Sequence, residues 1–184
     1  GVQMISNPKN DFERLFGPYP DGHCFEIENC QTHKKINDKA KNKDEGLKIA
    51  EFLLLETHAN KISISIIEAK SSSPQEHDNY IDDIKEKLTN SLSLFMAIYL
   101  GRHDEPGISN LFREADISKI DFKMILAIQN YPDSLRPLQD KLKNSLKKTA
   151  LIWNIDLNSV IVVNEAGARK HGLIRDLAVS NTNQ

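Results

Sequence analysis

The sequence predicts an α/β fold in which a central mixed β-sheet of about five strands is flanked by helices. Five apolar or alternating segments have the length of strands, and two longer segments between them repeat apolar residues every three or four positions, as amphipathic helices do. Strands interleaved with helices are typical of an α/β sandwich. No internal repeat or linker interrupts the pattern, so we expect a single domain over residues 2–184.

Length and composition are those of a globular protein. A chain of 184 residues can bury roughly 70% of its unfolded surface, which allows a full core without disulfides or a structural metal. Hydrophobic residues make up 39% and charged residues 27%, as in ordinary soluble domains. The formal net charge of -2 excludes a generally basic surface for nucleic acid, although local basic patches remain possible.

Membrane and secretion signals are not found. The longest continuous apolar run, Leu94 to Leu100, is far short of the ~20 residues that span a bilayer, and the N-terminal segment has no basic region followed by an apolar core. Only two cysteines occur, Cys24 and Cys30, which argues against a disulfide framework. We therefore expect a cytoplasmic protein with no membrane partner.

The first elements are short. The segment from Asn7 to Phe16 reads as a helix that stops before Gly17, Pro18 and Pro20, and the segment from Cys24 to Cys30 alternates like a strand. With His23 and His33 nearby, the cysteines could form a zinc site. Their spacing fits none of the tight Cys-x-x-Cys pairs, however, so two free, partly buried thiols are the favoured interpretation.

A lysine-rich segment follows. Residues 31–46 have no apolar period that could hold them on a core, which favours a mobile surface loop. Contact with phosphate groups of a nucleic acid is the alternative. The lysines that would make it are Lys34, Lys35, Lys39, Lys41 and Lys43.

Next comes a predicted hairpin whose strands span about Leu47 to Thr57 and Ile62 to Lys70, joined by residues 58–61. If Thr57 faces Ile62, the antiparallel register places Glu51 directly opposite Glu68. Because strand side chains alternate, Glu68 and Lys70 project from the same face. We therefore expect two carboxylates and one ammonium group to converge.

The remaining elements follow from capping and periodicity. Residues Ser73 to Glu76 (SPQE) form a capping box that starts a long helix, and the apolar stripe of that helix continues to Gly101. After it we expect, in order, a possible short helix at Ile108 to Ala115, a buried strand at Phe122 to Gln129, a helix with apolar residues from Leu138 to Ala150, and a strand at Ser159 to Val163. The segment from Asn164 to Gln184 is polar and ambiguous.

Charges inside these apolar strands suggest chemistry. A strand of Ile and Leu loses stability by carrying a carboxylate and an ammonium group toward its core unless they are paired, metal-bound or used. Two carboxylates about one ladder spacing apart suit Mg²⁺ or Mn²⁺, which keep several waters and bind substrate phosphates. A lysine beside such a metal could orient a water molecule or stabilise a pentacovalent phosphate. The pattern indicates metal-assisted phosphodiester hydrolysis.

These residues resemble a known family. Glu51, in Ala-Glu-Phe, followed by Glu68-Ala69-Lys70, in IIEAK, is similar to the motif of the PD-(D/E)xK nuclease superfamily, which has the restriction-endonuclease-like fold. The resemblance implies that Glu51 and Glu68 bind Mg²⁺ or Mn²⁺, that Ala69 offers its backbone carbonyl to the metal, and that Lys70 assists the attacking water. It also implies a nucleic-acid substrate, with DNA expected.

The sequence departs from that family at two points. Ala50 precedes the first acid where the family usually has Pro before Asp, and Gln75 and Tyr80 are five apart rather than in a Gln-x-x-x-Tyr helix motif. By resemblance, Glu13 or Glu28 could add a further carboxylate. The predicted catalytic set is Glu51, Glu68 and Lys70.

The acid-x-lysine pattern occurs three times, and its context selects one of them. Asp83 and Lys85 fall on a helix, where residues two apart do not share a face, and Asp121 and Lys123 open a strand with no acidic hairpin partner. Three readings of Glu68 and Lys70 stay open. They belong to a metal-dependent nuclease, to a catalytically inactive binding or assembly module of the same fold, or to a structural ion pair at a strand end.

Further basic residues could contact phosphates or simply form solvated faces. They are the helix lysines Lys141, Lys143, Lys147 and Lys148, and the later cluster of Arg169, Lys170, His171 and Arg175. A homodimer is also possible, because cleavage of a duplex needs two cuts.

Overall fold

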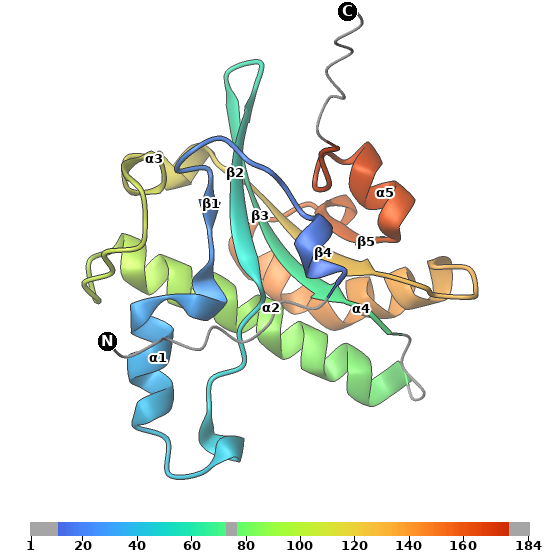
Figure 1. Cartoon of the computed structure of the whole chain (residues 1–184), viewed down its shortest axis with the longest axis horizontal. Helices are drawn as coiled ribbons and strands as arrows, with labels where there is room; N and C mark the ends of the chain where they lie inside the picture. Colours follow the sequence, from blue (N-terminus) through green and yellow to red (C-terminus); the bar gives the residue numbers. More distant parts are fainter. Residues whose placement is uncertain (1–10, 73–76, 177–184) are drawn as a thin grey trace, which may run out of the picture.

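The computed structural model describes residues 11–72 and 77–176, and its centre is a five-stranded mixed sheet in the order β1-β2-β3-β4-β5 (Figure 1). The first three strands run antiparallel to their neighbours, whereas β3, β4 and β5 are parallel. The strands are β1 (Cys24–Phe25), β2 (Phe52–His58), β3 (Lys61–Lys70), β4 (Asp121–Ile128) and β5 (Val160–Val163). The predicted α/β class with a mixed sheet flanked by helices is confirmed.

Two long helices, α2 (His77–Tyr99) and α4 (Arg136–Trp153), run side by side across one face of the sheet (Figure 1). Three shorter helices are α1 (Gln31–Asp38), α3 (Asn110–Arg113) and α5 (Glu165–Lys170). Short 3₁₀ turns are η1 (Glu13–Leu15), η2 (Ile27–Asn29), η3 (Lys43–Glu45), η4 (Ile117–Lys119) and η5 (Leu157–Ser159). Described residues include no helix that is long and apolar enough to cross a membrane.

The larger core lies between the sheet and these two helices. Even-numbered residues of β3, such as Ile64 and Ile66, point into it, together with the apolar stripe of α2 that the sequence predicts, including Ile84 and Leu88. Burying a side chain of this size contributes roughly 1.5–3 kcal/mol. This packing fixes α2 against the end of β3, where Glu68 lies on the same face.

The opposite face of the sheet is covered by the N-terminal segment and the segment around α5. Phe12 and Leu173 pack there against Ile67 and Ala69, which are odd-numbered residues of β3. The two covering segments also contact each other. The amide of Gly17 donates to the carbonyl of Leu173 at 3.0 Å, and the amide of Arg175 donates to the carbonyl of Gly17 at 2.9 Å.

The predicted hairpin register is confirmed. Thr57 pairs with Ile62, and the ladder continues to Phe52 opposite Ile67. The turn is tighter than expected, because His58 still pairs with Lys61 and only Ala59 and Asn60 connect the strands. Both have positive φ, at 47° and 66°, the left-handed conformation that two-residue type I′ hairpin turns need.

Two predictions for the N-terminal third are wrong. The strand predicted for Cys24 to Cys30 ends at Phe25, because this edge strand pairs with β2 over only two residues before the chain turns into η2. The lysine-rich segment predicted to be a loop contains α1. Tertiary contacts cap this helix, since Sγ of Cys30 accepts from the amide of His33 and a carboxylate oxygen of Glu105 accepts from the amide of Thr32.

Other element boundaries differ by a few residues from the prediction. The N-terminal helix is reduced to η1 in the described part of the segment, and the short helix expected at Ile108 to Ala115 is α3. The long helix ends at Tyr99, and Gly101 follows with φ of 73°. Residues 7–10 and the capping box at Ser73 to Glu76 lie outside the described residues.

Candidate functional site

Glu51 stands at a break in the sheet. The β2 ladder begins at Phe52, whose partner is Ile67, yet the amide of Glu51 also donates to the carbonyl of Ile67, at 3.0 Å. Two successive residues therefore oppose one, which is the arrangement of a β-bulge, and a bulge re-aims the side chains beside it. The predicted direct pairing of Glu51 with Glu68 is replaced by this offset.

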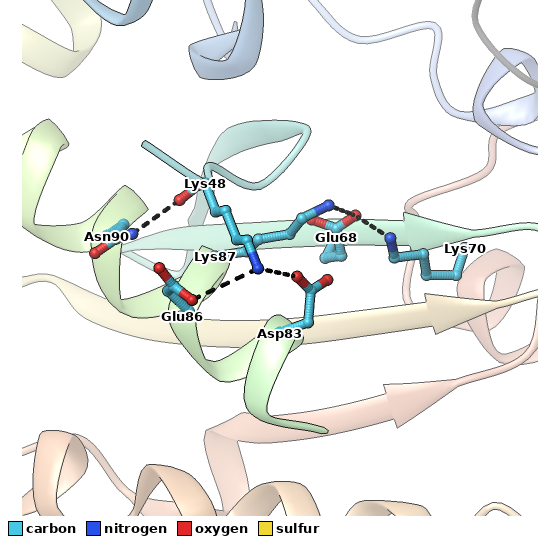
Figure 2. A network of polar contacts seen from close by, with 7 residues as sticks. All are labelled: Lys48, Glu68, Lys70, Asp83, Glu86, Lys87 and Asn90. Carbon is cyan, nitrogen blue, oxygen red and sulfur yellow. Dashed lines mark hydrogen bonds and ion pairs between the residues drawn. The ribbon is translucent and has the colours of Figure 1, made fainter. Parts of the chain in front are cut away.

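Glu68 is a carboxylate buried between two lysines. Its side chain is inaccessible to solvent, and Lys87 of α2 and Lys70 of β3 approach its Oε1 atom from two sides (Figure 2). The Nζ–Oε1 distance is 3.3 Å for Lys87, a hydrogen bond, and 3.8 Å for Lys70, an ion pair. The second carboxylate oxygen, Oε2, is buried and has no hydrogen-bond partner in the structure. Within the described residues, Oε1 therefore has a hydrogen bond and an ion pair, whereas Oε2 has no hydrogen-bond partner.

The helix α2 anchors the chain just before the break. Its Ser91 hydroxyl accepts a 2.8 Å hydrogen bond from the amide of Ala50, the residue before Glu51. The preceding residue, Asn90, donates to the carbonyl of Lys48, whose ammonium group pairs with Asp83 at 3.0 Å (Figure 2). The same helix therefore holds the backbone that leads to Glu51 and supplies the lysine that binds Glu68.

Tyr80 completes the polar side of this helix. Residues Tyr80, Ile84 and Lys87 are spaced four and three apart, so they share one face of α2. The Tyr80 hydroxyl is buried without a hydrogen-bond partner in the structure, and burial followed by the negative charge of Glu68 raises the pKa of the phenol. A second polar atom beside Glu68 is thus left unsatisfied.

A cavity of about 250 Å³ opens beside the start of β2. It lies where the chain leaves the sheet after β1, and residues of η1, of η2 and of the segment around Gly17 line it. Four carboxylates and three aromatic rings line it, from Glu13, Glu26, Glu28, Glu51, Phe16, Tyr19 and Phe52. Of the predicted site residues, Glu51 lines this cavity, whereas Glu68 is buried and is not among the residues that line it.

The acidic groups disfavour one another's ionisation. Burial is the largest cause that raises the pKa of Glu51, followed by its side-chain hydrogen bond with Glu28 and the charge of Glu68. The pKa of Glu68 is also raised, by burial, although the charges of Lys87 and Lys70 oppose the shift. Glu28 adds to the shift of both groups. The three carboxyl groups therefore belong to one electrostatic cluster.

The backbone of β3 also contributes a polar atom. The carbonyl of Ile67 points toward the β2 side, where it accepts from Glu51, and the carbonyl of Lys70 points toward the β4 side, where it accepts from Gln129 at 2.8 Å. Carbonyl directions alternate along a strand. The carbonyl of Ala69 therefore points to the same side as that of Ile67, the β2 side.

No group of three or more His, Cys, Asp or Glu side chains within residues 11–72 and 77–176 is arranged to hold a metal ion. This bears on the zinc alternative as well. Cys30 caps α1, and the ring nitrogens of His33 lie 2.6 Å from the carbonyl oxygen of Glu28 and 2.8 Å from that of Leu47. Neither cysteine forms a disulfide within the described residues, and burial is the main cause that raises the pKa of Cys30 to about 11.

The predicted nucleic-acid contacts lie on and after α1. The side chains of Lys34, Lys35, Lys39 and Lys41 are exposed, and that of Lys43 lies outside the described side chains. The helix begins two residues after Asn29, which lines the cavity. The structure thus brings the start of α1 close to the acidic cavity while its lysines remain in solvent.

Sequence reasoning missed Lys87, Tyr80 and Ser91. Lys87 and Tyr80 are polar residues of a kind that a helix normally turns to solvent, and the register between α2 and β3 cannot be read from either segment alone. One signal was available. Ser91 occupies a position within the apolar stripe of α2, between Leu88 and Phe95, where a polar side chain needs a partner.

Comparison of this chain with known proteins identifies no relative. No family model matches the sequence, and neither curated proteins nor solved structures match it. The geometry of the residues must therefore carry the functional argument.

Removing the Ser91 hydroxyl is expected to lower the free energy of unfolding by about 1–3 kcal/mol, because it leaves the buried Ala50 amide without an acceptor. Urea denaturation of Ser91→Ala would measure the loss. Ser93→Ala, an exposed serine on the same helix, is the matched control and should change stability little. Equal losses in the two variants would contradict the proposed anchoring role.

A second prediction concerns pH. Because the pKa of Glu51 is higher in the folded chain than the ordinary value of 4.5, the folded state keeps a proton that the unfolded state loses, and stability falls as pH rises above that value. Glu51→Gln cannot ionise, so in EDTA it should be more stable than wild type at pH 8, by on the order of 1 kcal/mol or about 2–4 °C in Tm.

The gain should shrink as the pH falls from 8 to 5, because near the ordinary pKa of 4.5 Glu51 begins to keep its proton in the unfolded wild type as well as in the folded one. Thermal unfolding at both pH values measures it. Glu114→Gln, which removes an exposed glutamate, controls for the change in surface charge. A gain that does not depend on pH would refute the assignment.

Proposed function

We propose that this protein is a divalent-metal-dependent nuclease of the PD-(D/E)xK type, with a restriction-endonuclease-like fold and DNA as the expected substrate. One observation carries the proposal. Within the described residues the buried Oε2 atom of Glu68 has no hydrogen-bond partner, Lys70 lies beside this carboxylate, and the charge of Glu68 adds to burial in raising the pKa of Glu51. An unsatisfied buried carboxylate oxygen is costly, and a cation would satisfy it.

The donor set fits Mg²⁺ or Mn²⁺. Mg²⁺ keeps several waters and needs only one or two protein carboxylates, so a site without three converging side chains is compatible with it. Glu68 would supply Oε2, Glu51 would supply a carboxylate oxygen from the cavity side, and Ala69 would supply its carbonyl. Burial raises the pKa of Glu51, the hydrogen bond with Glu28 and the charge of Glu68 add to the shift, and a bound cation would relieve the repulsion among these carboxylates.

The arrangement of elements also supports the proposal. Glu51 opens the second strand, Glu68-Ala69-Lys70 ends the third, and a helix and a parallel fourth strand follow. The superfamily places its acid and its Glu-x-Lys on the corresponding elements. This chain matches the superfamily in the order of its elements and in the elements that carry the acid and the Glu-x-Lys. Membership of that fold family is therefore proposed together with the activity.

The residues divide the chemistry between them. The metal, when bound, would polarise the phosphodiester and lower the pKa of a bound water. Glu51 and Glu68 hold it at the end of the hairpin. Lys70, whose ammonium group is 3.8 Å from Glu68 and partly exposed, would orient the attacking water or stabilise the charge that develops on the phosphate.

One observation favours a different function. Glu68 is inaccessible to solvent and already faces two ammonium groups, which is also what a structural ion pair would require. In that case the protein is a non-catalytic binding or assembly module of the same fold. This second candidate predicts that no divalent cation binds and that no phosphodiester is cut.

An activity assay with matched variants separates the two candidates. Supercoiled plasmid, single-stranded DNA and RNA are each incubated with Mg²⁺, Mn²⁺ or EDTA. We expect metal-dependent cleavage that Glu68→Ala and Lys70→Ala each lower by at least about 100-fold, because Glu68 would hold the metal and Lys70 would orient the attacking water or stabilise the charge on the phosphate.

The control keeps the same acid-x-lysine pattern outside the site. Asp121→Ala combined with Lys123→Ala, on β4, should leave cleavage unchanged. Cleavage that survives the Glu68 and Lys70 substitutions would come from a contaminant. Absence of both cleavage and Mn²⁺ binding in the wild type would favour the binding module.

The exposed lysines of α1 allow a binding test. Reversing two charges, with Lys34→Glu and Lys35→Glu together, should weaken DNA binding and reduce the slope of log K against log salt by about 1 for each phosphate that these lysines neutralise in the wild type. Fluorescence anisotropy in EDTA measures binding without cleavage. The matched control reverses Lys147 and Lys148 on α4, and an equal effect there would show that binding follows net charge alone.

A further inference from the structure

We propose that Lys87 is a positioning residue that holds Glu68 in a fixed orientation so that its second oxygen is left for the cation. The inference rests on the proposed metal site. It concerns a residue outside the acid-x-lysine motif, which the sequence pattern does not single out.

The two lysines make different contacts with the carboxylate. Lys87 donates a 3.3 Å hydrogen bond to Oε1, whereas Lys70 lies 3.8 Å from that atom, beyond hydrogen-bond distance (Figure 2). The Lys87 side chain is also the more buried, with 19% exposed against 29% for Lys70. Lys87 therefore has the geometry of a fixed contact, and Lys70 has more freedom to turn toward a substrate.

The origin of each lysine supports this division. Lys70 is on β3, two residues from Glu68 on the same strand, and can follow any movement of that strand. Lys87 reaches across from α2, which the apolar core and the hydrogen bond from Ala50 to Ser91 fix in place. A donor on a separate, anchored element restrains rotation of the carboxylate in a way that a neighbour on the same strand does not.

Holding Oε1 determines where the other oxygen points. The Lys87 contact occupies one side of the carboxylate, and Oε2 remains buried and without a partner. Without Lys87 the carboxylate could rotate and present both oxygens to Lys70, which would withdraw Oε2 from the cation. Partners that orient a ligand in this way typically contribute 10–100-fold in metal affinity.

The sign of the change in metal affinity tests the inference. If Lys87 orients Glu68, Lys87→Met should weaken Mn²⁺ binding by about 10–100-fold. If Lys87 only adds positive charge near the site, its removal should strengthen Mn²⁺ binding. Affinity is read from the electron paramagnetic resonance signal of free Mn²⁺, with no substrate present.

Three further variants complete the experiment. Lys87→Arg keeps a donor and a charge and should recover most of the affinity. Lys85→Met, an exposed lysine on the same helix, should bind Mn²⁺ as the wild type does. Circular dichroism and thermal unfolding in EDTA establish that each variant is folded, and Lys87→Leu replaces the methionine variant if that one unfolds.

The outcomes separate this inference from the proposed function. Unchanged or tighter Mn²⁺ binding by folded Lys87→Met would overturn the positioning role while leaving the metal site in place. A wild type that binds no Mn²⁺, or Glu68→Gln that binds it as tightly as the wild type, would overturn the proposed site and this inference with it.

Discussion

The arrangement of this protein depends on burying one carboxylate beneath a helix. Removing an unpaired charge from water costs several kcal/mol, so Glu68 can lie at the end of β3 only because ammonium groups accompany it. One of them, on Lys87, comes from α2. For Lys87 to reach Glu68, the helix must lie at a particular position along β3 and in a particular rotation about its own axis. The apolar stripe of α2 sets its distance from the sheet, and the polar contacts with Glu68 and Ala50 set its register.

Positive and negative groups are separated around this carboxylate. The two lysines approach Glu68 from α2 and from the end of β3. The other glutamates line the cavity, where the chain leaves the sheet after β1. The bulge at Glu51 lets the backbone continue into β2 beside β3 while the Glu51 side chain lines the cavity. Four glutamates line the cavity, and this concentration of carboxylates is the property that suits it to a cation.

Much of the fold could be predicted from periodicity, and the failures have local causes. The hairpin register followed from the alternation of Ile and polar residues and the short turn after Thr57. The helix α1 could not be found in this way, since its caps come from Cys30 and from Glu105, which is distant in sequence. Alternation alone extended β1 to Cys30, whereas an edge strand keeps only the length that its neighbour pairs.

The candidate site was predictable in its strand residues but not in its helical ones. Glu68 and Lys70 stand out because charge is unexpected in an apolar strand. Lys87 does not stand out, because a lysine on a helix is ordinary. The offset of Glu51 was likewise hidden, since a bulge leaves the residue pattern of a strand unchanged.

The joining of residues near both ends of the described chain has a consequence for biosynthesis. Gly17 and Tyr19, which line the cavity, are held by hydrogen bonds to Leu173 and Arg175, and the one from the hydroxyl of Tyr19 to Leu173 spans 154 positions of sequence. A nascent chain emerges from the ribosome in order, and contacts of such separation form late. The strands and α2 can assemble while these hydrogen bonds are still missing, so the enclosure around the glutamates closes only after nearly the whole domain has been translated.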